Sequence, residues 1–527
     1  MVKHMTRLIG FSASGIILAS VLSACAPSNE QSAPEANGVE IQGQIVAAES
    51  AVPAAVAAPA ASGQRPRDAI ARALYETNCA GCHGTDPSGG RSASLFRPAL
   101  LNEQSDEALR TTIVEGIADA GMPSFQGVLG DAEIAQLLAF VRNESATFAE
   151  RPVFVPSPDG VVIESEKQTF RIELLASGLD VPWGMDFLPD GRLLITERSG
   201  ALRIYQNGQL AEIPVAGTPR VHVGQDAGLF DVIVHPDYQS NGWIYLSYAE
   251  ALSGIESAYM TVVIRGKLDS QNEWIDTQEI FRAPAELYSA SGAHYGSRFL
   301  FDDEGHLFYS IGDRGVMAHA QDLSNPLGKI HRVNEDGTVP ADNPFFGVDG
   351  AIPSIWSYGH RNPQGLSFDP STGLLWSSEH GPTGGDEINL IEPGKNYGWG
   401  VVTMGLERGI TQHSAPGMEP PVVYYTPALS PSGITFYQGD RYPDWQNSLF
   451  VAGLAGQQLR RLEISGREVV GQEVLFDQFG RTRTAITGPD GLLYILLQNP
   501  TGTGTGLRLS DPTPGILIRL IPQSTEN

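Results

Sequence analysis

The stretch DDEGHLFYSIGD, residues 302–313, sets a pattern that recurs through the second half of the chain. A turn rich in Asp and Gly leads directly into a short apolar run of β-forming residues. The same unit recurs, irregularly spaced, as LPDGRLLITE (188–197), HPDYQSNGWIYLSY (235–248), DPSTGLLWSSEHG (369–381), YPDWQNSLFVAGL (442–454) and GPDGLLYILLQ (488–498). Six such units predict a six-bladed β-propeller, and the irregular spacing predicts long inserted loops that carry function.

The composition agrees with a largely all-β protein. The chain has 527 residues, of which 59 are Gly and 36 are Pro, so many turns are expected. Its formal net charge of −26 argues against a nucleic-acid partner, because phosphates require Lys and Arg. Solubility alone also explains such a charge.

The N-terminus has the pattern of an export signal. A short apolar run, 8–22, follows basic residues and ends near Cys25 in LSAC. With these flanks the run is too short for a membrane span. This pattern resembles the bacterial lipobox, which implies a lipidated Cys25; plain secretion is the alternative. Ala26 favours the outer membrane. The chain is therefore expected to be exported to the periplasm and to reach a membrane only through its lipid anchor.

A small helical unit follows an Ala/Pro-rich tether that has too little apolar bulk to fold. Ile70, Leu74 and Tyr75 lie at helical spacing, and Ser105 and Asp131 stand at N-cap positions of two later helices. These features predict a small all-α domain ahead of the propeller.

The helical unit contains NCAGCHGTD, residues 78–86. Cys-x-x-Cys-His is the motif of covalent c-type haem attachment, so Cys79 and Cys82 would hold haem and His83 would bind its iron. A redox dithiol followed by an incidental His is the alternative. Met122, in AGMPSF, is the candidate second axial ligand, and this loop placement resembles small class I cytochromes c.

Polar residues gather in the loops of the predicted propeller. His294 precedes a strand, GHRNPQG places Arg361 and Asn362 in a loop, and Arg481 and Arg483 stand two apart in an extended segment. Arginine pairs bind carboxylates, and a neutral His can act as a general base. Loop carbonyls near Asp and Glu suit Ca²⁺. Together they indicate a pocket for a polyanionic small molecule, although each alone is weak evidence.

The same loops resemble the soluble-type aldose sugar dehydrogenases, or glucose/sorbosone dehydrogenases, which use pyrroloquinoline quinone (PQQ). The resemblance spans roughly 170–522, with GHRNPQGL (359–366) and EHGPTGGDEINLI (379–391) as its most specific motifs. It implies that an aldose, or a related small molecule, is oxidised at a PQQ–Ca²⁺ site. The haem would pass electrons one at a time to an external acceptor, such as a cytochrome or a respiratory-chain component.

The resemblance also implies roles for single residues. His294 matches the catalytic base that takes the proton of the sugar C1 hydroxyl, and Arg361 matches a group that stabilises developing negative charge. The resemblance implies that PQQ is bound by Gln225, Arg361, Asn362, Arg481 and Arg483. The carbonyls of Gly381 and Pro382 would bind the Ca²⁺ that bridges to PQQ. A structural Ca²⁺ would be bound by Glu387 and Tyr397.

Three positions depart from the family pattern. Ala455 stands where the glucose branch has a PQQ-binding Lys, Thr484 follows the second Arg in place of Asp, and Thr426 replaces an aromatic that flanks the sugar. The alternatives are therefore oxidation of sorbosone or of a non-sugar alcohol or aldehyde, or a non-catalytic sugar-binding propeller. The expected organisation is a lipoprotein signal peptide (1–24), a tether (25–64), a cytochrome c domain (65–150), a linker (151–169) and the propeller (170–522).

Overall fold

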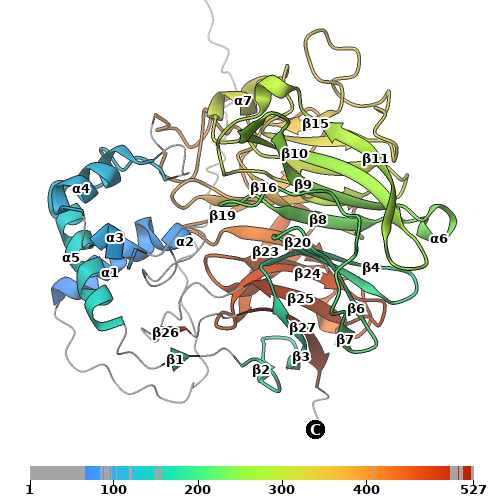
Figure 1. The fold of residues 1–527 in the computed structure, drawn as a ribbon, viewed down its shortest axis with the longest axis horizontal. Coiled ribbons are helices and arrows are strands. Elements are labelled where there is room, and N and C mark those ends of the chain that lie inside the picture. Colours follow the sequence, from blue (N-terminus) through green and yellow to red (C-terminus); the bar gives the residue numbers. More distant parts are fainter. Residues whose placement is uncertain are drawn as a thin grey trace, which may run out of the picture. The chain divides into compact units, whose positions relative to one another are not determined.

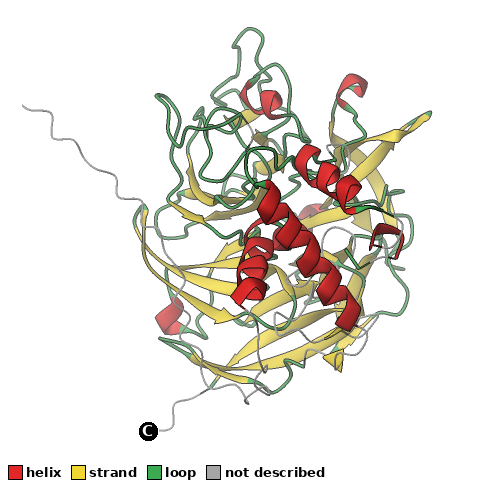
Figure 2. Cartoon of the chain, turned by 90° about the vertical axis from the view of Figure 1, so that its left-hand side faces the viewer, coloured by secondary structure: helices red, strands yellow, loops and turns green. Residues whose placement is uncertain are grey.

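The computed structural model describes residues 66–83, 87, 95–96, 98–101, 104–117, 122–148, 153–154, 157–407, 409–498, 508–509 and 514–523. The signal peptide, Cys25 and the tether lie outside these ranges. Within them, no helix combines the length and the apolar character that a membrane span requires. Figure 2 shows the two kinds of structure in the chain, a group of helices and a larger body of strands.

The helical domain is built from α1 (Pro66–Asn78), α2 (Ala80–His83), α3 (Pro98–Leu101), α4 (Asp106–Glu115) and α5 (Asp131–Phe148). Tyr75 of α1 packs against Phe140 of α5 with ring centroids 5.5 Å apart, in a cluster that forms the core of this domain. Ile70 lies in α1, as its helical spacing predicts, but its side chain is 57% exposed. Helix α1 is short and amphipathic, and its inward positions are Ala71 and Tyr75.

The helix caps follow the sequence in one case of two. Ser105 is the N-cap of α4, and its hydroxyl accepts a hydrogen bond from the backbone N–H of Ala108. Asp131 is instead the first residue of α5, and the backbone N–H of Gly130 before it donates to the Glu133 side chain at 2.7 Å. An acidic residue in the first turn still stabilises the helix dipole.

The strands form six sheets of at least four strands, the blades of a propeller (Figure 1). Blades 1 to 3 are β4 (Pro182–Phe187), β5 (Leu193–Glu197), β6 (Leu202–Gln206) and β7 (Gln209–Leu210); β8 (Leu229–Val234), β9 (Ile244–Leu252), β10 (Ile255–Leu268) and β11 (Trp274–Arg282); and β12 (Phe299–Phe301), β13 (Leu307–Ile311), β14 (Lys329–Val333) and β15 (Ile355–Tyr358).

The other three blades continue this order along the chain. Blades 4 and 5 are β16 (Pro363–Phe368), β17 (Leu375–Glu379), β18 (Asp386–Ile391) and β19 (Val423–Tyr425); and β20 (Pro431–Phe436), β21 (Ser448–Gly453), β22 (Gln458–Ser465) and β23 (Glu468–Phe476). Blade 6 is β24 (Arg481–Thr487), β25 (Leu493–Gln498), β27 (Gly515–Pro522), β3 (Thr169–Leu179) and β2 (Val162–Glu164). The predicted six-bladed propeller is confirmed.

Blade 6 closes the propeller by joining the two ends of the domain. The late strand β27 pairs antiparallel with β25 on one side and with the early strand β3 on the other. Strand β2, which lies in the segment expected to be a linker (151–169), extends this blade by pairing with β3. The same segment holds β1 (Val153–Phe154), which pairs in parallel with β26 (Arg508–Leu509).

Each of the six repeated sequence units is a turn followed by the second strand of a blade. Five of these second strands, β5, β13, β17, β21 and β25, are buried along their whole length, and β9 is buried except at its last three residues. Both of their faces are covered by neighbouring blades; for example, Leu194 and Leu246 share one apolar cluster of blades 1 and 2. Strands buried on both faces need nearly continuous runs of apolar or small residues, which is what the repeated units supply.

The first strand of a blade, which faces the propeller axis, breaks its pairing near its start. The register with the second strand shifts in β4, β8, β16, β20 and β24 within the first few residues. Such bulges turn side chains in new directions and are common beside functional sites.

Buried hydroxyl groups join the blades at these bulges. In blade 3, the Ser310 hydroxyl accepts from the backbone N–H of Arg298 at 3.0 Å and donates to the carbonyl of Pro363 in blade 4 at 2.9 Å. The same donation to the next blade is made by Thr196 to Phe230, by Ser247 to Ser297 and by Ser378 to Ser432.

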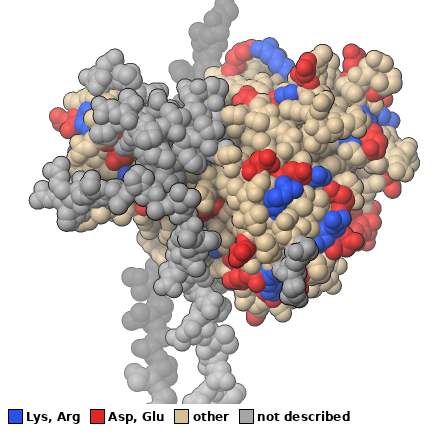
Figure 3. Space-filling view, turned by 90° about the horizontal axis from the view of Figure 1, so that it is seen from below, with Lys and Arg blue, Asp and Glu red and all other residues tan. Residues whose placement is uncertain are grey.

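The charge of the chain is spread over the face of the molecule that Figure 3 shows. There, acidic and basic side chains of the described residues are interspersed, with no region of one sign only. On this face the net charge of −26 therefore makes no acidic docking patch.

Ser310→Ala should lower the free energy of unfolding by about 1–3 kcal/mol, because it leaves a buried N–H and a buried carbonyl without their partner. Urea unfolding measures the effect. Ser257→Ala, at an exposed position of β10, is the matched control and should change stability by less than about 0.5 kcal/mol. Equal effects of the two substitutions would contradict the role of the hydroxyl bridge.

Candidate functional site

The predicted site residues gather at one end of the propeller. His294, Arg361 and Arg483 lie at or just before the starts of first strands, whereas Gly381 follows the end of a second strand. Because the first two strands of a blade run antiparallel, the start of one and the end of the other lie at the same end of the blade. Residues from blades 3, 4 and 6 therefore converge around the axis.

His294 is held in place by a carboxylate that sequence reasoning missed. Its Nδ1 lies 2.6 Å from Asp313 Oδ1, and Trp399 Nε1 donates to Asp313 Oδ2 at 2.6 Å. When Nδ1–H donates to Asp313, the lone pair of the neutral ring is on Nε2, so Nε2 is the atom that can accept a proton. The sequence signal for Asp313 was its place at the end of the strand in SIGD.

The environment keeps Asp313 ionised. Burial by itself would raise the pKa of this carboxyl, but the charge and hydrogen bond of His294 and the charge of Arg361 outweigh it and lower the pKa below its usual value. The backbone N–H of Gly315 also donates to Oδ1 at 2.8 Å. An ionised Asp313 orients the imidazole and stabilises it once it is protonated.

Arg361 belongs to the same group of side chains. Its guanidinium lies 5.1 Å from the ring centroid of Trp399, and its Nη1 donates to the carbonyl of His380 at 3.3 Å. Its own carbonyl accepts from the backbone N–H of Asp313 at 2.9 Å, and its backbone N–H donates to Glu379 Oε2 at 2.8 Å. The loops that carry His294 and Arg361 are thus linked through Asp313.

Asn362 and Gln225 contact the loop that carries His294, one after it and one before it. Asn362 is buried, and its Oδ1 accepts from the backbone N–H of Gly296 at 3.0 Å. Gln225 is exposed, and its side chain occupies the space that a Cβ at Gly292 would need. A glycine at 292 therefore permits the close approach of the two loops.

Arg481 and Arg483 are both buried beside the axis. Arg483 lies at a bulge of β24, so the simple alternation expected for an extended segment does not hold there. Its Nη1 donates to Gln364 Oε1 at 2.8 Å and to Ser432 Oγ at 3.1 Å, and no carboxylate of the described residues forms an ion pair with it. A buried guanidinium with only neutral partners favours binding of an anion.

The surroundings of Arg483 also disfavour its charge. Burial, followed by repulsion from Arg481 and Arg298, lowers the pKa of Arg483 well below its usual value. An anion bound here would relieve that repulsion through charge-assisted hydrogen bonds. The two arginines therefore fit the carboxylates of a polyanionic ligand such as PQQ.

A small pocket lies beside Arg361 and is lined by two carboxylates. Glu379 and Glu387 stand directly opposite each other on β17 and β18, and Asn389 Nδ2 donates to both at 3.1 Å. Burial, followed by the charge of Glu379, raises the pKa of Glu387 well above its usual value. A cation between them would remove this repulsion.

Oxygen donors of this kind fit Ca²⁺, with main-chain groups completing the set. The described residues contain no group of three or more His, Cys, Asp or Glu side chains that could hold a metal by themselves. Gly381 also lines the pocket, and its N–H donates to Asp386 Oδ1 at 2.8 Å, which fixes the loop that carries Gly381 and Pro382.

Tyr397 and Thr426 support this region through their hydroxyl groups. The Tyr397 hydroxyl donates to the carbonyl of Leu390 at 2.6 Å and accepts from the N–H of Glu392 at 2.9 Å, so it is already engaged by the backbone. Thr426 Oγ1 accepts from the N–H of Gly385 at 3.0 Å. Thr426, one of the departures from the family pattern, thus helps to hold the loop of Gly381.

The predicted haem ligands lie in the helical domain. Cys79 and Met122 pack against the same apolar cluster around Tyr75, and His83 ends α2, with its N–H donating to the carbonyl of Cys79 at 2.9 Å. An apolar cluster that reaches both a thiol and a thioether fits the hydrophobic porphyrin of haem. The side chain of Cys82 lies outside the described residues.

Known proteins agree with this arrangement. Aldose sugar dehydrogenase YliI of Escherichia coli (strain K12) is 39% identical over 343 residues, which cover 63% of this chain and 91% of that protein. The crystal structure of the soluble aldose sugar dehydrogenase from Escherichia coli in its apo form superposes with a TM-score of 0.61 at 36% identity and covers 67% of this chain and 100% of that one. The PQQ-bound aldose sugar dehydrogenase from Streptomyces coelicolor gives a TM-score of 0.56 at 26% identity, with 70% and 100% covered.

Family comparison divides the chain in the same way. Residues 66–141 match the subunit III family of cbb3-type cytochrome c oxidase, and residues 179–508 match the glucose/sorbosone dehydrogenase family. The chain therefore belongs to the glucose/sorbosone dehydrogenase family and carries a cytochrome c domain ahead of the propeller.

Proposed function

We propose that this chain is a quinohaemoprotein oxidoreductase that oxidises the C1 hydroxyl of an aldose to the lactone with PQQ and Ca²⁺. The observation that carries the proposal is the pair His294 and Asp313 beside the buried arginines at one end of the axis. Hydride abstraction from an alcohol carbon requires a base next to cationic groups that bind an anionic hydride acceptor. Simple sugar binding requires no base of this kind.

The residues divide the work of the reaction. His294 Nε2 takes the proton of the C1 hydroxyl, while the C1–H bond breaks and C1 becomes the lactone carbonyl. Asp313 stabilises the resulting imidazolium, and Arg361 stabilises negative charge that develops on oxygen. Arg481 and Arg483 would hold the carboxylates of PQQ, the carbonyls of Gly381 and Pro382 would hold Ca²⁺, and PQQ would supply the hydride acceptor.

The cytochrome domain supplies the outlet for electrons. Cys79 and Cys82 would hold haem covalently, His83 and Met122 would bind its iron, and the group would supply one-electron transfer. It would deliver electrons to an acceptor outside the chain. The sequence pattern around Cys25 supports a lipid-anchored position in the periplasm, on the outer membrane.

The deciding experiment adds an aldose to protein that holds haem and has been loaded with PQQ and Ca²⁺. The absorbance of the reduced haem should rise.

His294→Ala should bind PQQ but turn over at least roughly 10²-fold more slowly, because the base is gone. His306→Ala is the matched control: His306 also pairs with an aspartate, Asp302 at 2.9 Å, but at the opposite end of blade 3. Unchanged turnover in His294→Ala, or no haem reduction by any aldose, would exclude the proposal.

Asp313→Asn should lower turnover by roughly 10²–10⁴-fold, because an amide can hold the imidazole in the wrong tautomer.

Asp313→Asn should also change acid stability. The folded pKa of Asp313 is lowered, so its ionisation contributes stability above about pH 4 that is lost as the pH falls through the folded value. Urea midpoints between pH 7 and 3 should show this acid loss in the wild type and not in the variant.

Met122→Ala should leave sugar oxidation by a soluble dye intact but slow haem reduction and lower the haem potential, since a thioether ligand raises it. Visible spectroscopy and a redox titration measure the change. Met317→Ala, in the propeller helix α7 (Met317–Gln321), is the matched control. An unchanged haem spectrum and potential in Met122→Ala would show that another group is the axial ligand.

A further inference from the structure

Near its start, the first strand of each blade brings one side chain to a bulge beside the axis; in blade 3 this lies just before β12, where Ser297 and Arg298 both pair with Ser310. These six residues, here called the axial ring, are Trp183, Asp231, Arg298, Gln364, Ser432 and Arg483. All six are buried. The ring carries two guanidinium groups and one carboxylate, although only Arg483 was expected from the sequence to bind a ligand.

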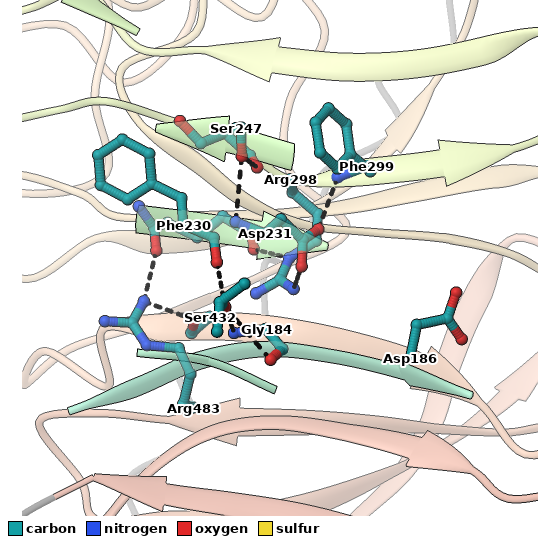
Figure 4. A network of polar contacts seen from close by, with 12 residues as sticks. Gly184, Asp186, Phe230, Asp231, Ser247, Arg298, Phe299, Ser432 and Arg483 are labelled. Atoms are coloured by element: carbon teal, nitrogen blue, oxygen red, sulfur yellow. Dashed lines mark hydrogen bonds and ion pairs between the residues drawn. The ribbon is translucent and has the colours of Figure 1, made fainter. Parts of the chain in front are cut away.

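The ring is connected through polar contacts, and Figure 4 labels Asp231, Arg298, Ser432 and Arg483 among its members. Cation–π contacts add to these. Arg298 Nη1 donates to Asp231 Oδ1 at 2.9 Å, and Arg298 Nε donates to the carbonyl of Gln364 at 2.8 Å. The Gln364 side chain in turn accepts from Arg483 at 2.8 Å. The guanidinium carbons of Arg298 and Arg483 lie 4.4 and 5.0 Å from the ring centroid of Trp183. Gln364 thus connects the two arginines.

Asp231 is the carboxylate that balances this charge. Its Oδ2 accepts from the backbone N–H of Phe299 at 2.9 Å while Oδ1 accepts from Arg298, so both oxygens act as acceptors. Gly184 stands next to it, where a Cβ would come within 2.4 Å of Oδ1. Only a glycine at 184 leaves room for the carboxylate at this point in the ring.

The charges of the ring are unequally compensated. Arg298 has an ionic partner, although its Nη2 has no hydrogen-bond partner in the described part of the chain. Arg483 has no carboxylate within ion-pair distance among the described residues, and repulsion from Arg481, which lies just outside the ring, and from Arg298 exceeds the longer-range attraction of Asp226. The net charge of the ring is therefore one positive unit, and the uncompensated cation is the one that the site offers to an anion.

We propose that Asp231 and Arg298 form a charge-setting pair: they hold the axial ring at one net positive charge and position Arg483 through Gln364, and so determine how tightly the site binds a polycarboxylate. This inference rests on the proposed function, in which that polycarboxylate is PQQ. Asp231 and Arg298 act through Arg483 and are positioning residues. In the low-dielectric interior, one added or removed charge at about 10 Å changes the affinity for an anion by roughly tenfold or more.

The test measures dissociation constants for PQQ by absorbance titration and ligand-induced thermal shifts. Asp231→Asn should lower the melting temperature of the ligand-free protein but tighten PQQ binding by roughly tenfold, because Arg298 becomes a second uncompensated cation. Arg298→Met should weaken binding by roughly tenfold, and the double variant should return close to the wild-type affinity. Should Arg298→Met fail to fold, Arg298→Lys retains the charge and should bind within a few-fold of wild type.

The pair Arg461 and Glu473 in blade 5 provides a matched control, since it is a buried ion pair of 2.5 Å away from the ring. Glu473→Gln should lower the melting temperature without changing PQQ affinity. If Asp231→Asn behaves like Glu473→Gln, the pair is merely structural and the inference is wrong. A second titration with benzene-1,3,5-tricarboxylate distinguishes failure of the proposed function from failure of this inference. If the wild type fails to bind PQQ, the proposed function fails. The charge-setting pair is still supported if affinity for the tricarboxylate falls in the order Asp231→Asn, wild type, Arg298→Met. Absence of that order with both probes overturns it.

Discussion

Buried hydroxyl groups on the second strands join neighbouring blades where the first strands bulge. Ser310 shows the geometry: one oxygen satisfies an N–H of its own blade and a carbonyl of the next. A first strand that left its pairing at this point without such a partner would bury unsatisfied backbone groups, at a cost of about 1–3 kcal/mol each. The hydroxyl bridges therefore permit the bulges, and the bulges turn Asp231, Arg298 and Arg483 toward the axis.

The site is built on this arrangement as two regions with opposite charge. Arg298 and Arg483, the arginines of the axial ring, form a positively charged region. Glu379 and Glu387 line an acidic pocket beside Arg361. The base His294 lies between loops from blades 2 and 4 and is oriented by Asp313. An anionic ligand and a cation would each find the complementary charge at this end of the propeller.

Much of the fold could be predicted from the sequence. The six repeated units identified the second strand of every blade, because strands buried on both faces need continuous apolar runs. The helical domain was predicted as well, but the spacing of its apolar residues did not reveal which of them face inward, and Ile70 is exposed. The extra strand β2 in blade 6 was not foreseen, since a three-residue strand has no periodicity to detect.

The sequence by itself determined which chemical groups are present: a haem-binding motif, a base, an arginine pair and loops with oxygen ligands. The tertiary structure decided how they act together. Trp399 and Arg298 lie far along the chain from Asp313 and Gln364, the residues they support, and these contacts arise only when blades meet around the axis. The local sequence pattern predicts the secondary structure of a segment. The charge balance of the site and the orientation of its side chains depend on distances between segments, which no local pattern contains.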